Sequence, residues 1–228
     1  MPTSKVADNQ KEKIDKIIDS VLEEKSETLA NLNQESIDVF KFLQYEFHKG
    51  DVTKNHLFQF VYRSFYRLDN AGLTPEFKTG YFELMESSRG KQLFDIEIIL
   101  CELEKFPRIK EKKKGEEKGS FQFSFATKLM NTIDKDFPIY DSQVSKVIIG
   151  TDHRPTGDFK NKLSVYKNRH EIIKKTYSHI LENDSFSSIF NEFDKSFPGN
   201  ELYEVKKLDF IFWSNGKLKT QKEQLNRK

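Results

Sequence analysis

The stretch Phe123–Ile148 reads FSFATKLMNTIDKDFPIYDSQVSKVI, and it contains two helical patterns joined by a proline-containing turn. In the first pattern, Phe125, Leu129 and Ile133 recur at i, i+4 and i+8, which is the spacing of one helix face. At roughly 100° per residue, Lys128 lies about 60° to one side of Phe125. The pattern predicts a helix whose buried face is bordered by this lysine.

The second pattern opens with an aspartate that follows a proline. Pro138 restricts Phe137 to extended conformations and fixes its own φ, so the chain approaches Asp141 stiffly. The apolar residues after Asp141 have helical spacing as far as Ile148, and Gly150 can end that helix. We therefore expect Asp141 to be an N-cap, with its side chain facing a cleft that it shares with Lys128.

Each residue has a structural interpretation and a catalytic one. Lys128 can snorkel, burying its stem while its ammonium group stays in water. Asp141 can serve as a helix cap and nothing more. The catalytic interpretation makes the lysine a nucleophile and the aspartate its carboxylate partner.

Two motifs in this stretch resemble the helix–hairpin–helix DNA glycosylase superfamily. FPIYDSQVSKVI resembles the motif in which a proline, a hydrophobic pair and an aspartate open a helix, and ATKLM resembles the G-T/R-K-x-A segment of the 8-oxoguanine and bifunctional branches. The family's lysine aligns with Lys128. The chain departs from the family where the hairpin normally reads L-P-G-V-G, because it has EEKGSFQFSFA there, and Lys128 and Asp141 are separated by only 13 positions.

The resemblance implies a lesion-excising enzyme. Such an enzyme extrudes the nucleotide from the duplex, and its lysine attacks the sugar to form a Schiff base. The amine of Lys128 needs a depressed pKa for this, which neighbours such as Phe121, Phe125 and Leu129 would provide by desolvation. Asp141 would remain ionised and stabilise positive charge on the sugar.

The rest of the chain is helical in pattern, because apolar residues recur at helical spacing and period-two alternation is rare. In LTPEF, Thr74 and Pro75 give a clear helix start. We predict an all-α, compact multi-helix glycosylase-like fold with a divergent helix–hairpin–helix region. Its consecutive ranges are an N-terminal helical region (1–106), a basic exposed loop (107–120), a glycosylase-like region (121–215) and a polar, frayed tail (216–228).

Composition excludes several classes of protein. The single cysteine, Cys101, excludes disulfide frameworks, zinc sites with several thiolates and iron–sulfur clusters, so we expect no metal and no cofactor. The N-terminus is polar, and no run approaches the roughly 18 apolar residues of a membrane span. We expect a cytoplasmic protein with no membrane partner.

Charge points to a polyanionic partner. The formal net charge is only +2, but residues 108–175 contain 16 Lys and Arg against 9 Asp and Glu. We expect lesion-bearing double-stranded DNA to be bound through salt-sensitive phosphate contacts. The candidate contacts are Lys112, Lys113, Lys114, Lys118, Lys146, Arg154, Lys160 and Lys162. His153 is interpreted as a turn residue in preference to a phosphate contact.

Two other functions stay open from the sequence. One is a glycosylase-like fold that binds nucleic acid without cutting it, in a defence or regulatory system, which the altered hairpin favours. The other is a helical protein-interaction domain in which Lys128 and Asp141 are only a snorkelling lysine and a cap. The sequence identifies no protein partner and no particular base.

Overall fold

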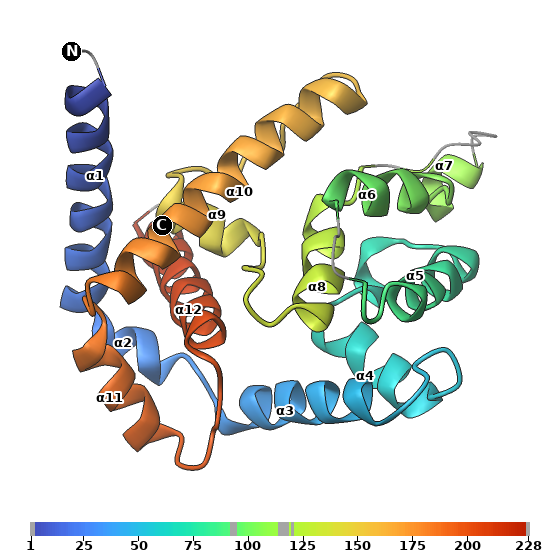
Figure 1. Ribbon diagram of the computed structural model, residues 1–228, viewed down its shortest axis with the longest axis horizontal. Coiled ribbons are helices and arrows are strands. Elements are labelled where there is room, and N and C mark those ends of the chain that lie inside the picture. The colour runs from blue at the N-terminus through green and yellow to red at the C-terminus, as the bar shows by residue number, and fades with distance from the viewer. Residues whose placement is uncertain (1–2, 92–94, 114–118, 120, 227–228) are drawn as a thin grey trace. The chain divides into compact units, whose positions relative to one another are not determined.

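The computed structural model describes residues 3–91, 95–113, 119 and 121–226 (Figure 1). The protein is all-α, as predicted, and within these residues the one β-type pairing is an isolated bridge between Leu73 and Arg108. None of the described helices is both long enough and apolar enough to cross a bilayer.

The chain forms two compact units. Unit 1 consists of residues 1–34, 140–155 and 165–228, and unit 2 of residues 35–139 and 156–164. The units therefore combine separated stretches, whereas the ranges expected from the sequence were consecutive.

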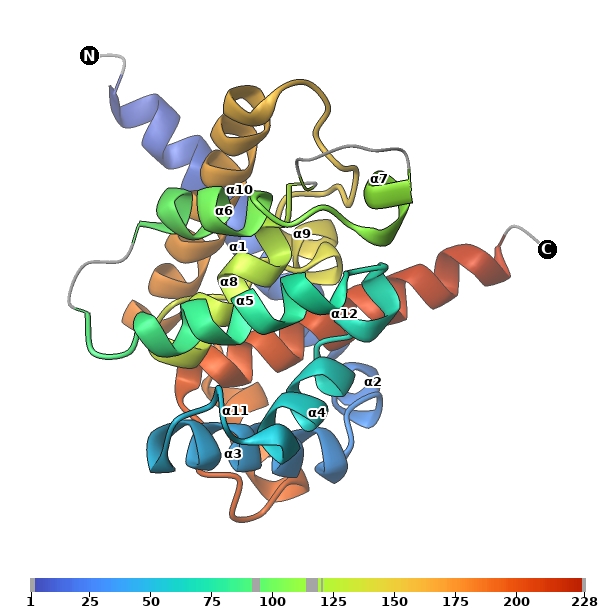
Figure 2. The same cartoon turned by 90° about the vertical axis from the view of Figure 1, so that its right-hand side faces the viewer.

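Unit 2 has an aromatic core. Its elements are α3 (Gln34–Lys49), α4 (His56–Phe65), η1 (Asp69–Ala71), α5 (Pro75–Ser87), α6 (Ile96–Glu104), α7 (Ile109–Lys113) and α8 (Phe123–Ile133). Helices α5, α6 and α8 pack together (Figure 2). Phe58, Tyr62, Phe77, Tyr81 and Phe82 are fully buried, and their rings meet in tilted, edge-to-face and stacked pairs.

Unit 1 is assembled around its last helix. It contains α1 (Thr3–Glu23), α2 (Lys25–Ala30), α9 (Ser142–Ile148), α11 (Ser187–Ser196), α12 (Glu204–Leu225) and α10 (Phe159–Glu182) from Val165 onward. Helix α12 packs against both α9 and α2 (Figure 1). Buried Ser214 donates to the carbonyl of Thr28 (2.6 Å), and Asn215 donates to the Thr28 hydroxyl (3.0 Å).

The local start signals are confirmed. The Thr74 hydroxyl accepts the N–H of Phe77 (3.2 Å), with Pro75 in the first helical turn. The carboxylate of Asp141 accepts the N–H of Gln143 (2.9 Å), which makes Asp141 the N-cap of α9.

Two segments expected to be irregular are helical, which corrects the prediction. Within the expected loop 107–120, α7 forms, and its first residue, Ile109, donates its N–H to the carbonyl of Gly72 (2.9 Å). The expected polar tail continues α12 to Leu225. There, Leu218 is buried and Thr220 donates to the side chain of Gln143 (3.1 Å), so packing against α9 stabilises residues that have little apolar pattern of their own.

Candidate functional site

Lys128 lies half-buried in the middle of α8, at the edge of its apolar face. Its Nζ donates to the Ser124 hydroxyl (3.2 Å), one helical turn earlier. The same nitrogen lies 5.2 Å from the ring centroid of Phe125 and 5.7 Å from that of Tyr66. Both distances are within the range of cation–π attraction, so the amine is bordered by two aromatic rings and one hydroxyl.

Buried hydroxyl groups connect α8 to the elements around it. Tyr81 donates to the carbonyl of Phe125 (2.8 Å), and its oxygen lies 3.0 Å from that of Tyr62. Tyr62 also approaches the Thr132 hydroxyl (3.3 Å), which donates to the carbonyl of Lys128 (2.9 Å). This set of three side chains, Tyr62, Tyr81 and Thr132, is called the hydroxyl chain below.

The protons of the hydroxyl chain can be assigned by counting. The three hydroxyl groups have one proton each, and together they make four contacts. The proton of Tyr81 is donated to the carbonyl of Phe125, and that of Thr132 to the carbonyl of Lys128. Tyr62 supplies the third, and its shorter contact is the one with Tyr81. Burial raises the pKa of both Tyr62 and Tyr81, so both hydroxyls stay protonated at neutral pH.

Asp141 occupies a braced position at the start of α9. The residue before it, Tyr140, is buried, and its hydroxyl lies 3.1 Å from that of Ser145 and accepts a hydrogen bond from Arg169 (3.3 Å). Asp141 itself is half-buried and holds the N–H of Gln143. Its carboxylate is therefore fixed by backbone geometry, which suits either a cap or a preorganised charge.

Helices α9 and α12 approach each other unusually closely at Gly216. A Cβ atom at this buried position would lie 2.4 Å from the carbonyl oxygen of Gln143 and 2.7 Å from its carbonyl carbon. Only glycine fits there without movement of the backbone. The N–H of Gln143 thus donates to the carboxylate of Asp141, and its carbonyl lies against the backbone of Gly216.

Charged residues are buried in α12 near Asp141. Asp209 accepts a hydrogen bond from the hydroxyl of buried Tyr177 (3.0 Å) and lies 3.6 Å from the amine of Lys206, and all three side chains are almost inaccessible. Burial raises the pKa of Tyr177 well above its ordinary value, and the charges of Asp209 and Asp141 raise it further.

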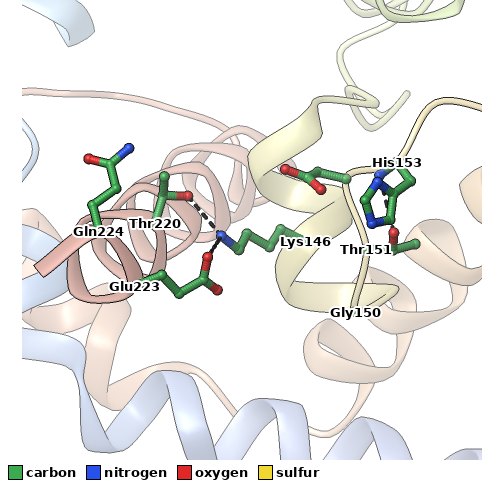
Figure 3. Close-up of a pocket in the computed structure, with 8 residues that line it drawn as sticks. Lys146, Gly150, Thr151, His153, Thr220, Glu223 and Gln224 are labelled. Atoms are coloured by element: carbon green, nitrogen blue, oxygen red, sulfur yellow. Dashed lines mark hydrogen bonds and ion pairs between the residues drawn. The ribbon is translucent and has the colours of Figure 1, made fainter. Parts of the chain in front are cut away.

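A polar pocket of about 420 Å³ opens beside α9 in unit 1 (Figure 3). It is lined by Lys146, Gly150, Thr151, Asp152, His153, Thr220, Glu223 and Gln224. Lys146 donates to Glu223 (2.6 Å) and to Thr220 (3.1 Å), as Figure 3 shows. The backbone N–H of exposed His153 donates to the Thr151 hydroxyl (3.1 Å), in keeping with its interpretation as a turn residue.

The candidate phosphate contacts lie in different surroundings. Lys113, Arg154 and Lys160 are exposed, Lys162 is half-buried, and Lys146 is ion-paired with Glu223. Lys112 belongs to α7, and Lys114 and Lys118 lie outside the described residues. Lys146 and Arg154 belong to unit 1, whereas Lys113, Lys160 and Lys162 belong to unit 2, so a DNA surface shared by these cations stays a prediction. Asp141 belongs to unit 1 and Lys128 to unit 2, so the catalytic pair stays a prediction as well.

Several residues of this region were not singled out from the sequence. Ser124 could have been found, because it precedes Lys128 by four positions on one helix face. Asp209 also gives a signal, since a lone acid in the apolar run LDFIFW predicts a buried charge. The hydroxyl chain gives no such signal, because its members come from three separate helices.

No protein-family model matches the chain, and the searches of curated proteins and of solved structures gave no match either. Within the described part of the chain, no group of three or more His, Cys, Asp or Glu side chains is arranged to hold a metal ion.

Proposed function

We propose that the protein is a DNA glycosylase with lyase activity, which excises a damaged or modified base through an imine formed by Lys128. The proposal rests on the resemblance of Phe123–Ile148 to the helix–hairpin–helix glycosylases. The observation that supports it most is the half-buried carboxylate of Asp141, which is fixed as the N-cap of α9. The altered hairpin sequence means that phosphate contacts would come from side chains elsewhere.

The chemistry requires a neutral amine. The Nζ lone pair of Lys128 attacks C1′ of the extruded nucleotide, and the glycosidic C1′–N bond breaks. The base leaves with the bonding electron pair and takes up a proton. The amine nitrogen then loses a proton, the C1′–O4′ bond breaks with protonation of O4′, and a protonated imine forms. Loss of a C2′ proton and cleavage of the C3′–O bond next release the downstream strand, which carries the phosphate at its 5′ end.

In this proposal Asp141 stabilises the positive charge that develops on the sugar. A carboxylate that is already oriented by a helix cap needs little reorganisation during the reaction, which is the physical advantage of the arrangement. Lys128 and Asp141 belong to different units, so their joint action is tested by measuring the reaction in variants of each residue.

We also propose that the protein acts in the cytoplasm on duplex DNA. The cysteine Cys101 carries a free, exposed thiol, which is typical of proteins from a reducing compartment. Phosphate binding would rely on exposed cations such as Lys113, Arg154 and Lys160.

The test is borohydride trapping with a panel of lesion-bearing and abasic duplexes. The wild-type protein should form a covalent adduct, and Lys128→Gln should form none, because an amide cannot make an imine. Lys217→Gln is the matched control, since Lys217 also lies over an aromatic ring, 4.5 Å from the centroid of Trp213. Equal trapping by wild type and Lys128→Gln would show that the nucleophile is assigned wrongly.

A second function, a protein-interaction domain, is favoured by one observation. Leu57 and Phe60 lie three positions apart in α4, and each is 60% exposed. Neighbouring exposed apolar side chains are common at protein interfaces. Absence of both an adduct and low-salt DNA binding would favour this function, whereas binding without an adduct would indicate a nucleic-acid-binding protein that has no lyase chemistry.

A further inference from the structure

We propose that Tyr66 is a positioning residue for the amine of Lys128, and that the hydroxyl chain fixes the helical turn that carries this lysine. The kinetic consequence rests on the proposed function, whereas the positioning itself is a property of the free protein. All the residues involved belong to unit 2.

Three contacts of the amine that the structure describes differ in what they can locate. Ser124 and Phe125 belong to α8 itself, so they move with Lys128 and cannot locate it relative to anything else. Tyr66 is the C-cap of α4, and its ring lies 5.7 Å from the Lys128 nitrogen. This contact therefore locates the amine relative to a second helix.

Tyr66 is itself held firmly. Its side chain is only 8% exposed, and its ring packs 4.6 Å from that of Tyr62 and 4.8 Å from that of Phe65, measured between centroids. Tyr62 is fully buried and belongs to the hydroxyl chain. A buried aromatic ring with such neighbours has little freedom to turn, so it presents a fixed face to the amine.

The hydroxyl chain reaches α8 at two carbonyls. Tyr81, from α5, donates to Phe125, and Thr132 donates to Lys128 while in contact with Tyr62, from α4. The two accepting residues are one turn apart and enclose the segment from which the Lys128 side chain projects. Removal of a hydroxyl would leave a buried polar group without its partner, so the chain resists displacement of this turn.

A fixed amine matters for imine formation. The nitrogen must meet C1′ along one line of approach, and a displacement of about 1 Å can cost on the order of 100-fold in rate. A free lysine side chain has many rotamers, whereas Ser124 and the two rings restrict this one. Tyr66 would act through Lys128 and would not touch the DNA.

The first experiment measures position without any substrate. Reductive ¹³C-methylation labels the lysine amines, and Lys128→Gln identifies the Lys128 resonance by its loss. Methyl groups over an aromatic face are shifted upfield by the ring current. The Lys128 signal should be shifted in the wild type and in Tyr66→Phe. In Tyr66→Leu it should move part of the way towards the bulk lysine signals, because the ring of Phe125 remains beside the amine.

The chain contains its own control. Lys217 lies over Trp213, 4.5 Å from the ring centroid, so Trp213→Leu should move the Lys217 signal and leave that of Lys128 in place. Tyr66→Leu should do the reverse. Circular dichroism of each variant checks that the helices are intact. If the leucine variant folds poorly, the wild-type signal is still a test, because a Lys128 signal among the bulk lysines would contradict the positioning.

The second experiment measures trapping rates on an abasic duplex. Tyr66→Leu should slow adduct formation roughly tenfold or more at saturating DNA with little change in affinity, and Tyr66→Phe should restore the rate. A Lys128 signal among the bulk lysines in the wild type, or one unmoved by Tyr66→Leu, would overturn the positioning role. A shifted signal in a wild-type protein that forms no adduct would leave positioning intact and reject the glycosylase.

Discussion

Replacing Gly216 with alanine tests how α9 and α12 pack. The new Cβ would lie 2.4 Å from the carbonyl oxygen of Gln143, where ordinary contact begins at 3.4 Å, so α9 has to move by about 1 Å. Alanine gains about 1 kcal/mol over glycine in a helix interior. Overpacking a close contact costs about 1–3 kcal/mol, and here the obstacle is backbone, which gives way less easily than a side chain.

With a backbone obstacle the upper part of this range applies, about 2–3 kcal/mol, and the helix gain of about 1 kcal/mol offsets some of it. We therefore expect the free energy of unfolding to fall by roughly 1–2 kcal/mol, measured by urea denaturation followed by circular dichroism. Gly50→Ala is the control, because a Cβ there meets nothing within 4 Å and should be neutral or slightly stabilising. The move would also displace Gln143, whose N–H is held by Asp141, so trapping should slow as well. A Gly216→Ala protein more stable than the wild type would refute the close approach.

Three further predictions concern single charged groups. Asp141→Asn should keep most of the α9 cap and the fold but slow borohydride trapping, and unchanged trapping would leave Asp141 with only a capping role. Fluorescence anisotropy at low salt should show a smaller loss of DNA affinity for Lys146→Gln than for Lys160→Gln, because Lys146 is already paired with Glu223 whereas Lys160 is exposed. Asp51 has a pKa lowered to about 2 by hydrogen bonds from Thr53, so its stabilising contribution is complete above its ordinary pKa of 3.8 and is lost as the pH falls towards 2. Asp51→Asn should therefore lose less stability than the wild type between pH 5 and pH 2.5 in urea titrations, and parallel curves would contradict the assignment.

Features set by neighbouring residues were predictable from the sequence. Thr74 and Asp141 cap the helices that their spacing indicated, and the apolar period located α8 around Lys128. The cap signals depend on three or four consecutive residues, and the apolar period on residues 125–133, so side-chain chemistry and helix geometry suffice.

Features set by distant partners were missed for a physical reason. The helical tail of α12 depends on α9, through Thr220 and Gln143, which are 77 positions apart. The first residue of α7 depends on the carbonyl of Gly72. The division into two units and the hydroxyl chain below Lys128 likewise arise from pairings of separate helices, which no local pattern specifies.

The join between α2 and α12 sets an order for folding on the ribosome. Thr28 accepts hydrogen bonds from Ser214 and Asn215, which are synthesised 186 and 187 positions later. At about 5–20 residues per second, the polar groups of α2 wait roughly 10–40 s for their partners. Most of unit 2 is one continuous stretch and can fold during that interval, whereas unit 1 can be completed only when the last helix has left the exit tunnel. A chain stalled before Ser214 should therefore present a protease-resistant unit 2 and a protease-sensitive N-terminal segment.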